Sequence, residues 1–566
     1  MRDFKKRYGW VFIVLVSVAP LNAQELLPSQ REAIEKVFEG YEGNPGCALG
    51  IFKDGQVLLA KGFGLSDLEN KRSITPNTIF NVASVTKQFT AACIFLLEME
   101  GKLSIGDDIR KFLPNFPSYA QNPIQIKHLL YHSSGLRSYL KLLHVKGIPW
   151  GTALNNEQVL GMLAKQKETN FKAGSKFSYS NSGYALLASI VEKASGQSLA
   201  SYAKEKIFEP LGMHNSYIAT SEQPKLPTVA KGYVPNNNGF VMEEHAQNVV
   251  VGDGGAHTTI SDFFKWSENF KTGKVGGALF VDKMMQLGKL NNGKETNYGG
   301  GLFLGDYQNT PGLFTIGHSG EWAGYRSLFF KFMEQDVAFV LLSNNANTNV
   351  WNLLNQLVPI VLEKELNAAR IAMEDNQVSE VIPKKTTQFK PKDLSSYTGH
   401  YFNPVEGYTR RIALENDTLA YVRSNGASTK LAPWDQNRFI FNNMPNVMLE
   451  FRPKETPKRL LLWIDREAPI HLQHYNPVSY DQNEIKRFEG KYYSEELDIY
   501  YSIKSDKSQI LVYLDNKELV RLTPVMENVF NDIHFGYLKF EADSKTRITG
   551  FTINDELVRN IHFKKS

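Results

Sequence analysis

The last third of the chain carries the same short pattern twice, and this repeat constrains the fold more than any other feature. Tyr397-Thr-Gly399-His-Tyr401 returns as Phe488-Glu-Gly490-Lys-Tyr492, 91 residues later. Three more pairs follow at nearly the same offset: Leu419-Ala-Tyr421 with Leu511-Val-Tyr513, Leu431-Ala-Pro433 with Leu522-Thr-Pro524, and Asn437-Arg-Phe439 with Asn528-Val-Phe530. Both units are rich in short apolar runs separated by turn residues, which is typical of strands. We therefore predict two small antiparallel β-barrels, residues 394–480 and 481–566, because closure removes exposed strand edges. One barrel shared between both halves is the alternative.

The chain before the repeat has a different texture. Residues 24–370 mix helical and strand patterns, and the polar residues 371–393 are typical of a linker. The expected elements are a hairpin around Asp54-Gly55, a helix over Lys87–Gly101, strands over 314–316, 327–332 and 337–343, and a helix over Val350–Leu366. This order predicts an α+β domain, an antiparallel sheet flanked by helices. The polar linker, with the complete set of motifs before it, predicts that this domain folds without the barrels.

The first 23 residues have the pattern of an export signal. A basic start precedes the apolar run Trp10–Pro20, and Ala23 is a small residue before the expected cleavage site. The run is too short to span a bilayer comfortably, and an uncleaved membrane anchor is the alternative. We expect a periplasmic or secreted protein without a stable membrane span after removal of the signal.

Charge and cysteine content exclude several classes of protein. The net charge is +5, from 64 basic and 59 acidic residues. Phosphate binding needs clustered Lys and Arg, so we expect no nucleic-acid partner. The two cysteines, Cys47 and Cys93, lie in apolar runs and are expected to be buried thiols. They cannot form a zinc site, and without metal or nucleotide motifs we expect no cofactor.

Ser84-Val-Thr-Lys87 is the first motif that carries chemistry. Ser84 stands at the start of the expected helix, and Lys87 follows one turn later on the same face. A serine hydroxyl is a weak nucleophile that needs a base, and burial of a lysine favours its neutral form. The same spacing recurs at Ser138-Tyr-Leu-Lys141 and Ser201-Tyr-Ala-Lys204, where we expect solvated helix surface.

The second motif is Tyr179-Ser180-Asn181, in a loop just before a predicted helix. A phenol can act as a general base if nearby cations lower its pKa, and an asparagine amide can both donate and accept a hydrogen bond. The alternative is a structural loop in which Asn181 caps the helix.

The third motif is His318-Ser319-Gly320, between two predicted strands. Gly320 would let a substrate backbone approach a strand edge closely, and His318 can hold a proton near neutral pH. Lys271-Thr272-Gly273 is a rival motif, but it closes a predicted helix, and we interpret its glycine as a helix C-cap.

With these motifs, residues 40–345 resemble the penicillin-recognising serine hydrolases. The similar branch contains class C β-lactamases, D-Ala-D-Ala carboxypeptidases, D-aminopeptidases and related esterases. The resemblance rests on Ala83–Ala91 (ASVTKQFTA), Leu129–Leu136 (LLYHSSGL), Tyr179–Gly183 (YSNSG) and Ile207–Met213 (IFEPLGM), in that order. The two predicted barrels are similar, more weakly, to the domains that follow the hydrolase domain in D-aminopeptidase-like members.

The resemblance implies a role for each matched position. The catalytic residues would be the nucleophile Ser84 and the proton-handling pair Lys87 and Tyr179. Substrate would be bound by Asn181, His318, Ser319 and Gly320, and the oxyanion by the backbone N–H groups of Ser84 and Glu321. A histidine in the third motif is similar to the carboxypeptidase and D-aminopeptidase members. Glu321 stands where small residues are common, so its side chain either repels a substrate carboxylate or turns to solvent.

We therefore expect an exported serine hydrolase that acts through an acyl-enzyme on a small peptide or ester, with D-amino-acid peptides as the favoured class. A β-lactamase or a carboxylesterase is the alternative within this chemistry. An alternative of another class is a non-catalytic protein that senses peptidoglycan or β-lactams. The intact Ser84, Lys87, Tyr179 and Asn181 favour the enzyme.

Overall fold

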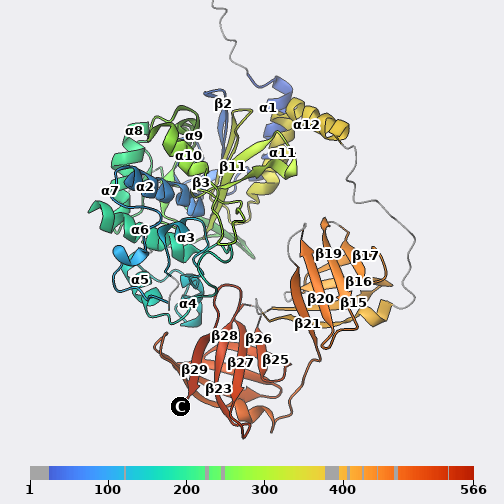
Figure 1. The fold of residues 1–566 in the computed structure, drawn as a ribbon. Coiled ribbons are helices and arrows are strands. Elements are labelled where there is room, and N and C mark those ends of the chain that lie inside the picture. The colour runs from blue at the N-terminus through green and yellow to red at the C-terminus, as the bar shows by residue number, and fades with distance from the viewer. Residues whose placement is uncertain are drawn as a thin grey trace, which may run out of the picture.

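The computed structural model describes residues 25–119, 123–222, 228–243, 249–376, 394–404, 408–423, 426–442, 444–464, 469–532 and 534–566. The expected export signal, residues 1–23, and residues 377–393 of the expected linker lie outside the described residues. Figure 1 shows a helix-and-sheet body followed by two barrels, with the second barrel below the helices α4 and α5. None of the described helices has the length and apolar character needed to cross a membrane.

An antiparallel sheet of six strands forms the middle of the first body, in the order β10-β11-β12-β13-β1-β2. The strands are β1 (Cys47–Lys53), β2 (Gln56–Phe63), β10 (Phe303–Asp306), β11 (Phe314–Trp322), β12 (Tyr325–Phe332) and β13 (Val337–Ser343). Every residue of β13 and nearly every residue of β1 is buried, because helices cover both faces of the sheet. This confirms the expected α+β class.

Side chains alternate between two cores along the strands, as the strand geometry requires. Leu328 and Phe330 of β12 belong to the core under α1 (Pro28–Val37) and α11 (Val350–Val361). Phe329, between them, belongs to the larger core. That core is built on α2 (Lys87–Met99), α6 (Asn181–Ser195) and α9 (Ile260–Thr272).

Shorter elements complete the first body. The helices are α3 (Ile126–Leu130), α4 (Tyr139–Val145), α5 (Asn156–Ala164), α7 (Leu199–Ala203), α8 (Glu209–Leu211), α10 (Gly277–Met285) and α12 (Glu363–Asn376). The short strands are β3 (Leu65–Asp67), β4 (Arg72–Ser73), β5 (Phe80–Asn81), β6 (Tyr217–Ile218), β7 (Tyr233–Asn236), β8 (Gly239–Met242) and β9 (Ala256–Thr258).

The repeat forms two closed barrels, and the alternative of one shared barrel is wrong. Barrel 1 consists of β14 (Gly399–Asn403), β15 (Tyr408–Glu415), β16 (Thr418–Arg423), β17 (Ser428–Pro433), β18 (Arg438–Phe441), β19 (Met444–Arg452), β20 (Arg459–Ile464) and β21 (Ile470–Tyr475). Barrel 2 consists of β22 (Gly490–Ser494), β23 (Ile499–Asp506), β24 (Gln509–Leu514), β25 (Lys517–Met526), β26 (Val529–Asp532), β27 (Gly536–Ala542), β28 (Ile548–Asn554) and β29 (Ile561–Lys565).

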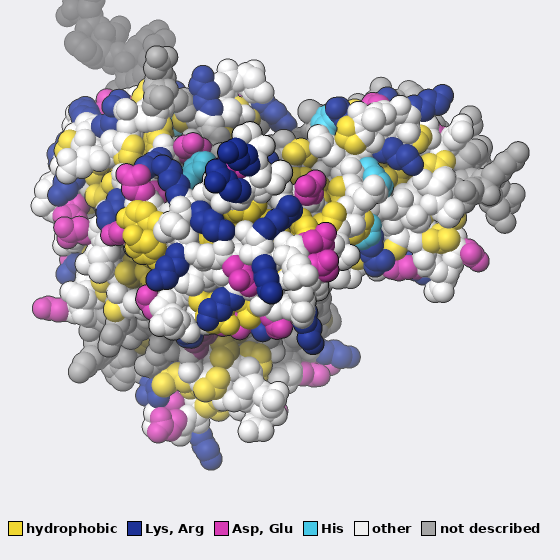
Figure 2. All heavy atoms as spheres, turned by 90° about the horizontal axis from the view of Figure 1, so that it is seen from below, with side chains coloured by type: hydrophobic (Ala, Val, Ile, Leu, Met, Phe, Trp, Pro, Cys, Tyr) yellow, Lys and Arg dark blue, Asp and Glu magenta, His cyan; other side chains and the backbone are white. Residues whose placement is uncertain are grey.

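Barrel 2 packs directly on the first body. Most of its buried apolar residues belong to the same core as α2 and α6, and its Tyr501 hydroxyl donates to the carbonyl of Val145 at the end of α4. Barrel 1 packs on barrel 2, where the rings of Phe402 and Tyr537 lie 5.5 Å apart. Figure 2 shows the molecule from below, with basic and acidic side chains interspersed over the surface that faces the viewer.

The structure differs in detail from several predictions about individual elements. The His318-Ser319-Gly320 motif lies inside β11, not between two strands. The helix expected over Val350–Leu366 divides at Leu362 into α11 and α12, and α12 continues past the expected domain end at residue 370. The backbone of Leu362, with φ −115° and ψ 29°, departs from helical geometry at this point. Cys47 and Cys93 are buried, free thiols, as expected.

Candidate active site

Ser84 lies in a short 3-10 turn, η2 (Ala83–Thr86), that leads into α2. From Val82 to Phe95 every residue is buried except Ser84, which is half-buried. Ala83, just before it, has a φ of 46°. A side chain in this left-handed region costs about 1–3 kcal/mol, and such strain clusters at functional sites. The chain therefore turns sharply to present one hydroxyl from an otherwise buried segment.

The third motif lies directly against this turn. The Ser327 hydroxyl of β12 donates to the carbonyl of Val82 over 2.7 Å. A Cβ placed on Gly320 would lie 2.3 Å from that carbonyl oxygen and 3.0 Å from the backbone nitrogen of Ser84. Only glycine at position 320 lets β11 come this close to the nucleophile.

Lys87 is completely buried and has three acceptors for its amine. Its Nζ lies 3.1 Å from Ser84 Oγ, 2.8 Å from Asn181 Oδ1 and 2.7 Å from the carbonyl oxygen of Asp253. Burial lowers the pKa of Lys87 to about 7, and the charge of Asp253 opposes this only in part. A neutral amine can donate to Asn181 and Asp253 and still turn its lone pair to the Ser84 hydroxyl, which is the geometry of a general base.

Tyr179 precedes α6, whose N-cap is Ser180, so Asn181 is not the cap and its amide is turned to Lys87. The Tyr179 ring centroid lies 4.8 Å from Lys87 Nζ. Burial nevertheless raises the pKa of the phenol, and its hydrogen bond with Ser84 opposes this only in part. The condition for a tyrosine base, a lowered pKa, is therefore not met, and the Tyr179 phenol is neutral.

His132 holds the loop that carries Tyr179. Its Nδ1 accepts a hydrogen bond from the backbone N–H of Ser180 over 3.0 Å, and its carbonyl accepts one from Ser178 over 2.8 Å. The ring centroids of His132 and Tyr179 are 4.3 Å apart. Burial lowers the pKa of His132 well below its usual value, so the imidazole is neutral and can accept. His132 therefore has the packing and hydrogen-bonding role typical of a buried histidine.

His318 lies on the same face of β11 as Ile316 of the larger core, and its side chain is buried. Its ring centroid lies 5.8 Å from that of Tyr179. Burial and the nearby Lys87 lower the pKa of His318 to about 3. The third motif therefore presents a neutral imidazole at neutral pH.

One edge of β11 has no paired strand among the described residues where it passes the His318-Ser319-Gly320 motif. β10 pairs with β11 only over residues 314–317, and from His318 to Trp322 the pairing recorded among the described strands is with β12 alone. An unpaired edge of this kind can bind an extended substrate backbone as an added strand. Ser319 and Gly320 lie on this segment, beside Ser84.

Glu321 turns away from the catalytic side. Successive strand residues point to opposite faces, so its side chain leaves β11 on the face opposite His318. The side chain is 73% exposed, and its carboxylate lies 2.8 Å from the guanidinium of Arg326. Of the two alternatives for Glu321, the structure shows the side chain that turns to solvent.

Two tryptophans stand near the end of the same strand segment. Trp322 follows Gly320 by two residues on the same face, which places it about 7 Å further along the strand. Trp150, from the loop between α4 and α5, is 57% exposed, and its ring centroid lies 4.8 Å from that of Trp322. This pair offers a large aromatic surface about two residue lengths along the strand from Gly320, which lies beside the nucleophile.

Asp253 and Tyr139 belong to the site but carry no motif that sequence reasoning recognised. The Tyr139 hydroxyl donates to Asp253 Oδ2 over 2.9 Å, and both residues are buried. Burial raises the pKa of the Asp253 carboxyl, and Lys87 opposes this shift. The only signal in the sequence is an aspartate inside the run Gly252-Asp253-Gly254-Gly255, a composition also found in ordinary turns.

The geometry thus brings together a half-buried serine, a buried lysine within hydrogen-bond distance of its hydroxyl, a neutral tyrosine and an open strand edge. This arrangement suits a serine hydrolase. Over the described part of the chain, no group of three or more side chains is placed to bind a metal ion.

Comparison with known proteins agrees with this chemistry. The Beta-lactamase family model matches residues 34–358, more than half of the chain, and the protein belongs to this family. It is similar to penicillin-binding protein 4* of Bacillus subtilis strain 168, with 28% identity over 430 residues, 73% of this chain and 91% of the relative. The protein is thus a serine hydrolase of the β-lactamase and penicillin-binding-protein family.

Two further similarities reach different parts of the chain. A D-aminopeptidase of Brucella anthropi is 27% identical over 348 residues, which cover 60% of this chain and 64% of that enzyme. The structure of an octameric penicillin-binding protein homologue from Pyrococcus abyssi superposes with a TM-score of 0.54 at 25% identity. It covers 79% of this chain and 99% of its own.

Proposed function

We propose that the protein is an exported hydrolase that forms an acyl-enzyme at Ser84 and cleaves amide bonds of D-amino-acid peptides. The observation that carries this proposal is the buried Lys87, 3.1 Å from Ser84 Oγ, with its pKa lowered to about 7. Such a lysine is a base at neutral pH, whereas a lysine in solution is almost fully charged.

Each residue has a defined step in this mechanism. Neutral Lys87 takes the proton of Ser84 Oγ as the oxygen attacks the carbonyl carbon of the substrate. The backbone N–H groups of Ser84 and Glu321 bind the oxyanion. Tyr179 gives its proton to the leaving amine and is reprotonated from the Lys87 ammonium. Water then attacks the ester carbonyl and gives one proton back to Ser84, which releases the acid.

The substrate class follows from the neutral third motif. His318 is uncharged at physiological pH, so it does not attract a carboxylate beside the scissile bond. This favours a peptide amide or an amino-terminated substrate over one that ends in a free carboxylate. Similarity to D-aminopeptidases supports the choice of D-residues. A β-lactamase or a carboxylesterase uses the same acylation chemistry and is the second candidate.

A labelling experiment tests the nucleophile. A fluorophosphonate probe is expected to add its mass to Ser84 of the wild type, and the Ser84→Ala variant is expected to remain unlabelled. Ser201→Ala, in another Ser-x-x-Lys sequence on an exposed helix position, is the matched control and should label normally. Equal labelling of wild type and Ser84→Ala would refute the assignment.

A substrate panel then separates the remaining candidates. It contains D-aminoacyl amides, D-Ala-D-Ala peptides, short esters and a chromogenic cephalosporin. We expect turnover of the D-aminoacyl amides to be fastest. Labelling at Ser84 without turnover of any substrate would instead indicate a sensor. Export is checked separately, because cleavage after Ala23 predicts a mature protein that begins at Gln24.

A further inference from the structure

Two of the three acceptors that hold Lys87 depend on one short segment, Arg137 to Tyr139. The Ser182 hydroxyl donates to the carbonyl of Arg137 over 2.7 Å and accepts from the N–H of Tyr139 over 2.8 Å. Ser182 is the neighbour of Asn181, the first acceptor. The Tyr139 side chain holds Asp253, the second acceptor, through its 2.9 Å hydrogen bond. A shift of this segment therefore moves the surroundings of Lys87.

Barrel 2 holds the same segment from the other side. The side chain of Arg137 is completely buried and forms an ion pair with Glu496, in the loop between β22 and β23, which is 2% exposed. Arg137 Nη2 also donates to the carbonyl of Asn560 over 2.9 Å. One residue further, the N–H of Ser138 donates to the carbonyl of Leu557 over 3.0 Å.

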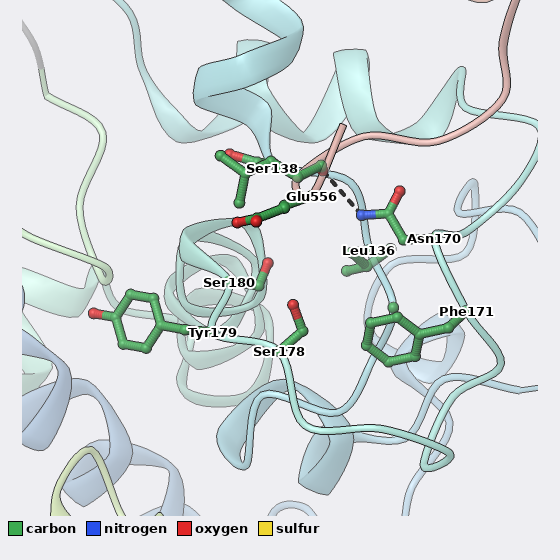
Figure 3. Close-up of a pocket in the computed structure, with 10 residues that line it drawn as sticks. Leu136, Ser138, Asn170, Phe171, Ser178, Tyr179, Ser180 and Glu556 are labelled. Carbon is green, nitrogen blue, oxygen red and sulfur yellow. Dashed lines mark hydrogen bonds between the residues drawn. The ribbon is translucent and has the colours of Figure 1, made fainter. Parts of the chain in front are cut away.

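The loop that carries Tyr179 is supported by barrel 2 as well. A small crevice behind this loop is lined by Leu136, Ser138, Asn170, Phe171 and the loop itself on one side, and by Glu556 and Leu557 of barrel 2 on the other. In Figure 3 the Tyr179 ring points away from this crevice, whereas Ser178 and Ser180 lie beside Glu556. The loop therefore lies between the barrel and the catalytic residues.

The ion pair between Arg137 and Glu496 holds residues 137–139 in place because the Arg137 guanidinium is buried. Removing one partner of a buried ion pair leaves the other charge uncompensated, which is strongly unfavourable. Gln166 is a further neighbour of Arg137, but its amide oxygen is uncharged and cannot replace a carboxylate. Without the charge of Glu496, Arg137 has to move toward water, and residues 137–139 move with it.

We propose that barrel 2 is part of the catalytic machinery, and that Glu496 is a positioning residue that fixes Lys87 through Arg137, Ser182 and Tyr139. This inference rests on the proposed function, because it assigns a support to the same Ser84 and Lys87. It predicts that a residue far along the chain from the nucleophile controls how fast Ser84 is acylated.

The experiment compares two adjacent glutamates in the full-length protein. Glu496→Gln removes the buried charge, whereas Glu495→Gln removes an exposed ion pair with Lys167 in the same interface. The readout is the rate of fluorophosphonate labelling of Ser84 as a function of pH. For Glu496→Gln we expect labelling at neutral pH to slow by about tenfold to a hundredfold, since a displacement of about 1 Å has effects of this size. The pH midpoint should also rise as water reaches Lys87. Glu495→Gln should behave as wild type.

A second variant keeps the proposal testable if Glu496→Gln does not fold. Tyr139→Phe removes only the hydrogen bond to Asp253 and leaves the barrel interface unchanged. We expect an altered pH midpoint in a protein that still folds cooperatively. Wild-type rates and midpoints in both variants would overturn the proposal. Failure of the wild type to label at all would instead refute the proposed function, so the two failures are distinguishable.

Discussion

The carboxylate of Glu321 lies 2.8 Å from the guanidinium of Arg326, its cross-strand neighbour on β12. The pair sits on the face of the sheet opposite His318, and the Glu321 side chain is 73% exposed. An exposed charge paired in this way acts weakly at a distance, because solvent and salt screen it. Glu321 is therefore not a barrier to a substrate carboxylate.

This geometry gives the first prediction. Glu321→Gln should change the ratio of kcat/KM for a peptide amide and the matching peptide acid by no more than about fivefold, since exposed pairs are worth about 0–1 kcal/mol. The ratio itself should favour the amide in both proteins. A tenfold change in this ratio would show that the carboxylate acts on the substrate after all. Glu321→Gly is less suitable, because it also loosens the strand that carries the oxyanion N–H.

The second prediction concerns the pH dependence of acylation. Lys87 acts as a base only when neutral, and its pKa is lowered to about 7. The labelling rate of Ser84 should therefore rise through about pH 7 and level off above it, with about a tenfold loss for each pH unit below the midpoint. His318 does not contribute a step there, because its pKa is lowered to about 3.

Two variants separate these groups. Lys87→Arg keeps a positive charge that cannot be removed at accessible pH, so labelling should be slow and without the step near pH 7. In His318→Gln the step should remain at its wild-type pH, whatever the absolute rate. Loss of the step in His318→Gln with its retention in Lys87→Arg would reverse the assignment.

The sequence predicted best those features that depend on residues close together in the chain. Ser84 and Lys87 are one turn apart, so their contact follows from helix geometry. The closed barrels followed from a repeat within one region of the chain. The protonation state of each catalytic-site side chain was harder to predict, because it depends on how deeply the folded protein buries that side chain. Neutral His318 and the raised pKa of Tyr179 arise from the packing of several distant segments around them.

Contacts between the first body and barrel 2 could not be predicted from the sequence. Arg137 and Glu496 are single charged residues without any motif, and their ion pair exists only because barrel 2 docks on α4. The expectation that the first domain folds alone rested on the polar linker. The shared apolar core and the buried pair instead give the expectation that removal of barrel 2 destabilises the first domain.

The third prediction concerns the aromatic pair near the open edge of β11. Trp322 and Trp150 present a large apolar surface about 7 Å along the strand from Gly320. Aromatic surfaces favour large apolar side chains. Trp322→Ala should therefore lower kcat/KM for a D-Phe amide by about tenfold relative to a D-Ala amide, or about 1.4 kcal/mol.

The control is an exposed tryptophan elsewhere in the first body. Trp351, on α11 at the other face of the sheet, is 43% exposed and should be replaceable by alanine without any change in this ratio. An unchanged preference in Trp322→Ala would show that the pair serves packing alone and that the substrate side chain lies elsewhere.

The last prediction concerns stability in weak acid. Burial lowers the pKa of His128 and His257 to about 4 and that of His318 to about 3, so all three are neutral in the folded protein at pH 5. In the unfolded chain each takes up a proton below its ordinary pKa of about 6.5. The unfolded state then binds more protons, so stability must fall as the pH falls from about 6.5 toward the folded-state pKa values. Well below pH 6.5 the loss approaches about 1.4 kcal/mol per pH unit for each histidine.

His257→Gln should flatten the slope of the free energy of unfolding between pH 6.5 and 5, a range above the ordinary pKa values of carboxyl groups. Equal slopes in wild type and His257→Gln would contradict the assignment of a buried neutral imidazole at position 257.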